Sequence, residues 1–362
     1  MSIHSIHSIR SIRSIRDLTD PAAGPHAVQL IVEALTAGWD IPVVLHRGDP
    51  VVSVRDHYDL LRYPPDAVTR DRRYSRYVDD DHMLRAHTTA HIPALLRDLP
   101  HDDVLLAVPG LCYRRDVIDR NHVGEPHQLD LWRIRLASPP LDEGDLAGMI
   151  SRVVGAVLPG RAVTTPASPH PYTVDGRELY VDGVEIGECG VAHPEVLAAA
   201  GLPASATGLA MGLGLDRLAM LVKGIDDIRL LRSPDPRVAA QMADLGPYRP
   251  VSSMPPIRRD LSLAVDADLD PELLGDRVRD VLGAGAGSLE ELAVLGETAY
   301  ADLPPVARER LGIRAGQKNI LVRLVIRDHR RTLTTEDANR IRDAVYAALH
   351  AGSTHQWAAP ER

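Results

Sequence analysis

Two adjacent arginines, Arg114 and Arg115, have the residue type and the setting for phosphate chemistry. They follow an apolar, β-prone run at 104–108, and after a polar loop apolar and polar residues alternate again over 128–136, which predicts two antiparallel strands joined by a long loop. Neighbours in a strand point to opposite faces, so only one of the two can face a given site. A guanidinium held on a sheet suits a phosphate, because its donors match two oxygens and its charge does not titrate. A solvated ion pair with Asp116 is the competing interpretation.

A second segment of this kind runs from Thr207 to Leu221. Its first half is small and apolar like a buried strand, and leucines at 215, 218 and 221 give its second half helical spacing. Gly212 and Gly214 allow another group to approach the backbone closely, and Arg217 lies in the first turn of the predicted helix. The segment does not match a dinucleotide-binding fingerprint, because the third glycine is replaced and the chain here does not alternate strands and helices.

Polar residues also gather at 85–91, where a predicted strand or turn becomes a helix. His87 and His91 are four residues apart, as in a zinc pair on one helical face, but no third ligand with suitable spacing is nearby, so we expect no metal held by protein spacing. Thr88 and Thr89 suit a helix N-cap whose hydroxyls can hydrogen-bond a small ligand.

A hairpin is predicted at 179–186, with Asp182-Gly183 as its turn. Glu185 lies between apolar neighbours there and faces the side opposite to them. It is either a site residue or a carboxylate that points to solvent.

Composition limits the class of protein. A chain of 362 residues, 44% of them hydrophobic, has room for two domains with packed cores. The net charge of -9 at pH 7 argues against a general nucleic-acid binder and permits local basic faces. Cys112 and Cys189 lack a CxxC partner, so we expect a reducing, cytoplasmic location and no structural zinc. No apolar run approaches the roughly 20 residues of a membrane span, so we expect no membrane partner.

These segments together resemble a known family. The paired-strand arginines and the Gly-x-Gly-x-Asp-Arg junction at 212–217 resemble motifs 2 and 3 of class II aminoacyl-tRNA synthetases. More closely, 82–91, 113–130 and 211–230 resemble phenylalanyl-tRNA synthetase of the single-chain, organellar type. Three motifs in the right order over about residues 17–350 make the resemblance specific.

The resemblance implies an α+β fold, in which a class II antiparallel sheet flanked by helices is followed by a ferredoxin-like β-α-β-β-α-β domain. The strict period-three repeat at the start of the chain matches neither helix nor strand and predicts a disordered tail at 1–16. The resemblance implies a catalytic domain at 17–245 and an anticodon-binding domain at 249–350, followed by a C-terminal tail at 351–362. Pro50 matches the motif 1 proline that usually lies at a dimer interface, but the single-chain type works without dimerising, so monomer and homodimer both stay open.

The implied activity is the ATP-dependent activation of phenylalanine, or a close analogue, as an aminoacyl-adenylate and its transfer to the phenylalanine tRNA. ATP and Mg²⁺ would be required, and catalysis would rest on positioning and electrostatics without a protein nucleophile. Arg114 would hold the α-phosphate and Arg217 the γ-phosphate. The implied ATP and adenylate ligands are Asp116, Asn121, His122, Gly212 and Gly214. The implied amino-acid ligands are Thr89, His91, Gln128, Asp130, Glu185, Pro166, Ser168 and Met211.

The C-terminal segment is less acidic than the rest of the chain, and several of its arginines are clustered enough to meet tRNA phosphates. A solvated charged face is the alternative for any one of them. The candidates are Arg258, Arg259, Arg327, Arg330 and Arg331.

The chain departs from the family where the substrate ring is held. The family grips the ring with two phenylalanines, and alignment back from Cys189 places Pro166 and Ser168 there. Met211 replaces another phenylalanine, and Asp130 replaces a glutamate. An aromatic pair contributes about 0.5–1.5 kcal/mol beyond its buried area. The change therefore predicts roughly tenfold weaker phenylalanine binding, or a pocket that accepts another side chain.

Two other functions stay open: an amino-acid-activating enzyme of specialised metabolism that uses a different amino acid, and a silent tRNA-binding relative. Phenylalanine itself is absent from the chain, although on the order of ten residues would be typical at this length. We hypothesise that the absence lets the protein be translated when charged phenylalanine tRNA is scarce or wrongly charged.

Overall fold

The computed structural model of the chain describes residues 15–251, 255–328 and 330–355. These residues form two compact units. The first contains the described residues up to Arg114, Glu125–Ile225 and Ala240–Tyr248, and the second contains Arg115–Gly124, Asp226–Ala239 and the described residues from Arg249. The long loop after Arg114 therefore groups with the second unit, while the strands that flank it belong to the first. Of the predicted repeat tail at 1–16, residues 1–14 lie outside the described residues, as do residues 356–362 of the C-terminal tail.

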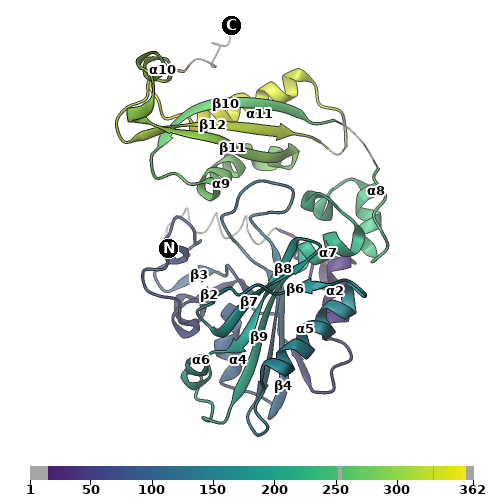
Figure 1. The fold of residues 1–362 in the computed structure, drawn as a ribbon. Coiled ribbons are helices and arrows are strands. Elements are labelled where there is room, and N and C mark those ends of the chain that lie inside the picture. The colour runs from purple at the N-terminus through teal and green to yellow at the C-terminus, as the bar shows by residue number, and fades with distance from the viewer. Residues whose placement is uncertain (1–14, 252–254, 329, 356–362) are drawn as a thin grey trace. The chain divides into compact units, whose positions relative to one another are not determined.

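A seven-stranded sheet forms the centre of the first unit (Figure 1), in the order β1-β4-β5-β9-β8-β7-β6. β1 and β4 pair in parallel, and every other neighbouring pair is antiparallel. The predicted class II sheet within an α+β fold is thus confirmed. The strands are β1 (Val43–Leu45), β4 (Asp103–Leu111), β5 (His127–Arg135), β6 (Val163–Thr164), β7 (Thr173–Val181), β8 (Val184–Ala192) and β9 (Thr207–Gly214).

The hairpin between β7 and β8 turns at Asp182 and Gly183, as predicted. Their φ angles are 51° and 77°, so both residues adopt the left-handed backbone conformation. Two-residue hairpin loops favour this geometry because its twist matches that of the strands, and Asp-Gly reaches it at low cost.

Helices cover both faces of this sheet. α2 (Ala27–Thr36), α5 (Glu143–Val157) and α7 (Leu215–Lys223) pack together over one face, and α7 begins directly where β9 ends (Figure 1). The other face packs against the short η4 (Thr88–His91) and α4 (Ile92–Leu96), with Ile92 and Leu96 buried against β4 and β5. The main elements are completed by a small two-stranded antiparallel sheet and two short helices: β2 (Val51–Ser53), β3 (His82–Leu84), α3 (Val54–His57) and α6 (Pro194–Ala199).

The second unit contains a three-stranded antiparallel sheet in the order β10-β12-β11. α9 and α11 pack on each other, and α11 also packs on β10. This is the order of the first three strands in a ferredoxin-like fold, while the fourth strand of the predicted pattern is not among the described residues. The elements are β10 (Ile257–Asp266), α9 (Pro271–Leu282), β11 (Leu289–Ala299), α10 (Pro305–Leu311), β12 (Gln317–Ile326) and α11 (Thr335–Leu349), with η5 (Ile228–Arg232) and α8 (Pro236–Ala239) upstream.

None of the helices in the described part of the chain combines the length and apolarity that a membrane crossing needs.

Candidate active site

Three central strands place two carboxylates and a glycine in one row on the η4-covered face of the sheet. Asp130 of β5 is directly opposite Gly212 of β9, and Gly212 is directly opposite Glu188 of β8. Residues opposite each other in paired strands point to the same face, so both carboxylates lie on one face with a position lacking a side chain between them. In adjacent rows of β5, Gln128 is opposite Gly214 and Trp132 is opposite Ala210.

Asp130 is buried beneath a set of hydrogen-bond donors. Thr88 Oγ1 donates to it at 2.7 Å, Thr89 Oγ1 at 2.9 Å and Trp132 Nε1 at 3.3 Å. Burial raises the pKa of Asp130 to about 6, although these hydrogen bonds favour the ionised form. The hydroxyls of Thr88 and Thr89 therefore bond Asp130, and the η4 N-cap is His87, which makes no side-chain capping bond.

Arg114 directs its guanidinium toward this face. Its Nε donates to Ala86 O at 2.7 Å. The pKa of His57 is lowered to about 3, mainly by burial and next by the positive charge of Arg114. Its charge also acts on Glu188. Arg115 instead pairs with Asp276 at 2.5 Å within the second unit, so the two adjacent arginines have different partners.

Arg217 and its neighbour Asp216 point in different directions at the start of α7. Asp216 is buried and accepts from the backbone N–H of His127, the first residue of β5, which ties the helix start to the sheet. Arg217 Nη1 lies 3.1 Å from Glu185 Oε2 and also donates to Glu185 O at 3.1 Å. Gly214 is the N-cap residue of the helix. A Cβ atom placed on Gly214 would lie 3.8 Å from Ile186 O and 4.0 Å from Arg217 Cδ, which are ordinary contact distances.

Glu188, His170 and Tyr172 form a polar group that the sequence analysis did not single out. Glu188 Oε2 lies 2.8 Å from His170 Nε2, and the Tyr172 hydroxyl donates to Glu188 Oε1. Burial alone would raise the pKa of Glu188, but the hydrogen bond and charge of His170 hold it below its ordinary value. The same pairing outweighs burial at His170 and raises its pKa. Both pKa shifts favour an ion pair between the Glu188 carboxylate and the His170 imidazolium.

His87 was likewise not among the predicted ligands. Neither of its ring nitrogens has a hydrogen-bond partner in the described part of the chain. Its ring stacks on Tyr63 at 5.6 Å between centroids and lies 4.0 Å from that of His57. Burial, then the His57 and Arg114 charges, hold the pKa of His87 well below its ordinary value, so it is neutral. Its position directly before Thr88 and Thr89 was the sequence signal that could have pointed to it.

Several predicted amino-acid ligands lie away from the row. Met211 is buried and, by strand alternation, points to the opposite, α7-covered face of the sheet, so the structure contradicts its place in the amino-acid site. His91 Nε2 bonds Arg85 Nη1 at 2.9 Å, and its ring fills the space where Gly48 lacks a side chain.

The residues at the expected ring clamp are not apolar contacts either. Pro166 is exposed, and Ser168 Oγ donates to Glu178 Oε1 at 3.1 Å. Gln128 is half-buried and accepts a 3.4 Å hydrogen bond from Cys112 Sγ. Asp130 and Gly212 therefore lie in the same row as Glu188, on which the charge of Arg114 acts, while Pro166 and Ser168 both hydrogen-bond Glu178.

Known proteins are similar to this chain over most of its length. Residues 42–242 match the family described as tRNA synthetases class II core domain (F). The chain is 31% identical over 328 residues to the phenylalanine–tRNA ligase, chloroplastic/mitochondrial, of Arabidopsis thaliana, covering 83% of this chain and 70% of that protein. The chain belongs to the class II phenylalanine–tRNA ligase family. It is also 29% identical to a probable mitochondrial phenylalanine–tRNA ligase of Drosophila melanogaster, over 84% of this chain and 77% of that protein.

A further relative is the phenylalanine–tRNA ligase alpha subunit of Acaryochloris marina, which is 33% identical over 51% of this chain and 56% of that protein. Among solved structures, a pyrrolysyl-tRNA synthetase from Desulfitobacterium hafniense is 17% identical with a TM-score of 0.48, covering 64% of this chain and 79% of that one.

The expectation of a cytoplasmic location is wrong by these comparisons, because the relatives that match most of the chain are named as mitochondrial or chloroplastic enzymes. The expectation rested on two cysteines without CxxC partners. Unpaired cysteines indicate a reducing environment and do not tell one reducing compartment from another.

The loop after Arg114, residues 115–124, belongs to the second unit and is held there by hydrogen bonds. Leu292 N donates to Ile118 O at 2.9 Å, which joins the loop to β11, and Arg279 Nη1 donates to Asp116 O at 2.5 Å. Within the loop, His122 Nδ1 contacts Asp119 Oδ2 at 2.7 Å, while Asn121 is exposed. Three residues predicted as ATP ligands therefore belong to the second unit: Asp116, Asn121 and His122.

A buried carboxylate joins three parts of that unit. Glu290 of β11 pairs with Arg120 of the loop at 2.6 Å, with Arg229 of η5 at 3.4 Å and with Arg327 at 2.8 Å. Only 1% of Glu290 is exposed. Three guanidinium groups around one buried carboxylate compensate for its desolvation.

Most of the arginines proposed from sequence to meet tRNA have acidic or amide partners. Arg327 pairs with Glu290, while Arg330 lies 3.1 Å from Asp328 and Arg331 lies 2.6 Å from Asp337. The side chains of Arg330 and Arg331 still expose 59% and 57% of their surface. Arg259 donates to Asn339 Oδ1 at 2.9 Å, and Arg258 is exposed.

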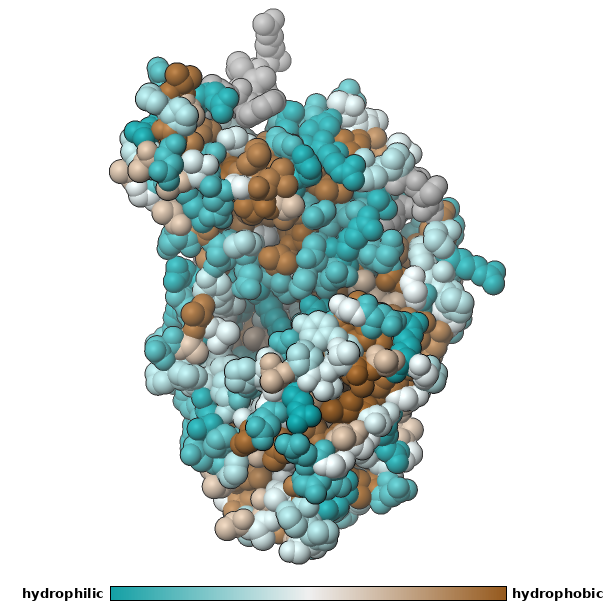
Figure 2. Space-filling model, in the orientation of Figure 1, coloured by the Kyte–Doolittle hydropathy of each residue, from teal (hydrophilic) through white to brown (hydrophobic). Residues whose placement is uncertain are grey.

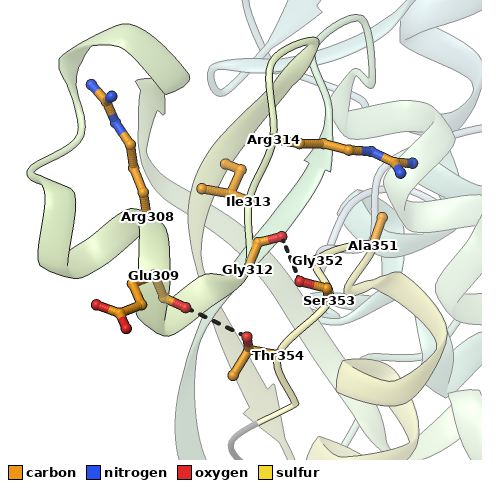
Figure 3. Close-up of a pocket in the computed structure, with 9 residues that line it drawn as sticks. All are labelled: Arg308, Glu309, Gly312, Ile313, Arg314, Ala351, Gly352, Ser353 and Thr354. Carbon is orange, nitrogen blue, oxygen red and sulfur yellow. Dashed lines mark hydrogen bonds between the residues drawn. The ribbon is translucent and has the colours of Figure 1, made fainter.

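One cavity of about 660 Å³ lies in the second unit, between α10 and the segment after α11 (Figure 3). Arg308 and Arg314 are among its lining residues, and Thr354 Oγ1 donates to Glu309 O across it. It contains none of the residues that the sequence indicated for ATP, amino acid or tRNA.

Mg²⁺ fits this site as an ion that arrives with ATP. In the described ranges, no group of three or more His, Cys, Asp or Glu side chains could form a metal cage. Mg²⁺ commonly needs only one or two carboxylates besides substrate phosphates. Glu185, with 42% of its side chain exposed beside Arg217, is the carboxylate suited to that role.

Proposed function

We propose that this protein activates phenylalanine, or a close analogue, with ATP and transfers it to a tRNA. Amino-acid activation and tRNA charging are the activities of its family, and the geometry supports this function in the chain itself. The observation that carries the proposal is that the charge of Arg114 acts on Glu188, in the same row as Asp130 and Gly212, while Arg217 lies just beyond the end of β9.

In the first step, an oxygen of the amino-acid carboxylate bonds to the α-phosphorus of ATP while the bond from that phosphorus to the pyrophosphate oxygen breaks. Negative charge grows on the phosphoryl oxygens, and Arg114 and Arg217 are the fixed cations suited to it. Mg²⁺ would add further neutralisation of the phosphates. No protein nucleophile is required, because the reaction needs reactants held in line and charge stabilised.

The substrate ammonium needs an acceptor on the same face. Asp130 provides a carboxylate, and Thr88 and Thr89 orient it through the hydrogen bonds described above. In the second step, a ribose hydroxyl of the tRNA attacks the carbonyl carbon of the adenylate, and AMP leaves.

The second unit supplies the expected contact with tRNA. Its surface shows hydrophilic residues interspersed with smaller apolar areas on the face seen in Figure 2. Arg258, Arg330 and Arg331 are the predicted arginines with the most accessible charge. Arginines of this kind attract the phosphate backbone, and their contribution weakens with salt.

The test is amino-acid-dependent exchange between ATP and pyrophosphate, followed by charging of phenylalanine tRNA transcript. We expect exchange with at least one aromatic amino acid and transfer of that amino acid to the tRNA. Exchange without any transfer to tRNA would favour an enzyme of specialised metabolism. No exchange with any amino acid would contradict the proposal and favour a silent tRNA-binding relative.

A further inference from the structure

Glu188 is the accessible carboxylate of the Asp130–Gly212–Glu188 row. Its side chain exposes 37% of its surface, whereas Asp130 as a residue is only 2% exposed beneath its threonine donors. The two carboxylates lie two strand spacings apart, which is roughly 10 Å between their Cα atoms. Gly212 leaves the space between them open, and a Cβ built there would lie 3.7 Å from Glu188 Cγ.

The hydrogen bonds of Glu188 leave acceptor capacity for a ligand. A carboxylate can accept about four hydrogen bonds. Tyr172 uses one site on Oε1 and His170 one on Oε2, so a lone pair on each oxygen is left. His170 Nε2 lies 2.8 Å from Glu188 Oε2, and the raised pKa of His170 favours an ion pair there, so a neutral donor such as a hydroxyl or an arylamine completes the group without adding a charge.

Buried aromatic rings pack beside this carboxylate. The Tyr63 ring lies 6.5 Å from that of Tyr172 and stacks on His87, and burial, followed by the charge of Glu188, raises the pKa of the Tyr63 hydroxyl. The Tyr172 ring in turn lies 5.9 Å from Trp132. Flat rings flanking a carboxylate suit a planar substrate side chain with a donor at its edge.

We propose that Glu188 determines amino-acid specificity, and that the preferred substrate is a phenylalanine analogue with a hydrogen-bond donor on its ring, a hydroxyl or an amine. This inference rests on the function proposed above and narrows its substrate. The ring of unsubstituted phenylalanine would place carbon against the Glu188 oxygens and leave their remaining acceptor sites without a hydrogen-bond donor. Sites built to hydrogen-bond a substrate group reject the analogue that lacks it strongly, by up to about 10⁴–10⁵-fold.

The experiment measures kcat/KM for ATP–pyrophosphate exchange with two groups of amino acids. Tyrosine, meta-tyrosine and the 3- and 4-aminophenylalanines carry a donor, while phenylalanine and 4-fluorophenylalanine are of similar size without one. In the wild-type protein we expect the best donor-bearing substrate to exceed phenylalanine by about 100-fold or more. In Glu188→Ala we expect the kcat/KM values of the best donor-bearing substrate and of phenylalanine to differ by less than about tenfold.

Glu143→Ala is the matched control. Glu143 lies on α5, exposes 64% of its side chain and forms an ion pair with Arg177, which is not a residue of the candidate site. We expect it to keep the wild-type ratio. Since each ratio compares substrates on the same variant, partial loss of folded protein cancels. A wild-type preference for phenylalanine, or a Glu188→Ala ratio equal to that of the wild type, would overturn the specificity role and leave the proposed function standing. Absence of exchange with every amino acid would overturn both.

Discussion

Replacing Arg114 with lysine tests whether a fixed guanidinium, and not positive charge alone, serves the reaction. Arg114 Nε is anchored at 2.7 Å to Ala86 O, which leaves the terminal nitrogens to face the substrate. Lysine keeps the charge but cannot make that anchor and two parallel donor bonds at once. Loss of one preorganised transition-state donor costs about 2.7–4 kcal/mol, which is about 10²–10³-fold in kcat.

The assay is ATP–pyrophosphate exchange at saturating ATP, with Arg115→Lys as the control. Arg115 is the adjacent residue, yet it pairs with Asp276, so lysine there keeps an ion pair and exchange is expected within about threefold of wild type. Melting curves of both variants establish that each is folded. If Arg114→Lys loses less than about tenfold, or Arg115→Lys loses as much as Arg114→Lys, the assignment of Arg114 to the phosphate is refuted.

Three other predictions follow from the same structure. Burial raises the pKa of Asp130 from 3.8 to about 6, so ionisation of Asp130 lowers the free energy of unfolding as pH rises through that range, by up to about 3 kcal/mol at 1.36 kcal/mol per pKa unit. Urea unfolding of Asp130→Asn at pH 4.5 and 8 should lack this part of the pH dependence. A pH dependence equal to that of the wild type would contradict the prediction. Glu290→Ala removes the buried carboxylate that pairs with the guanidinium groups of Arg120 and Arg327 and should cost about 1.5–3 kcal/mol. Glu291→Ala on the same strand should cost under about 1 kcal/mol, and equal losses in urea unfolding would argue against a special role for Glu290. If the absence of phenylalanine protects translation, a phenylalanine-free reporter keeps its output during phenylalanine starvation while a reporter with phenylalanine codons loses it, and equal outputs would disprove the hypothesis.

Features of this protein that depend on neighbouring residues in the chain were predictable from sequence. The alternation around Arg114 gave the β4–β5 strand pair, and Asp182-Gly183 gave the β7–β8 turn. The glycines before Arg217 gave the junction of β9 and α7. Periodicity and turn chemistry act over a few residues, so they can be recognised without knowledge of partners. The order of three such segments was enough to identify the family.

The composition of the site depended on contacts between segments distant in the chain. Strand alternation shows that two neighbours face opposite ways, but only pairing with other elements decides which of them faces the site. Arg114 and Arg115 lie beyond the last residue of β4, so their separate partners, Ala86 and Asp276, distinguish them. Within β9, strand pairing places Gly212 on the η4-covered face and Met211 on the other. Glu188 had no local signal, because its importance comes from lying opposite Gly212 and against His170. The sequence by itself determined the family and its strands, and the tertiary structure decided which side chains share the face where the amino acid would bind.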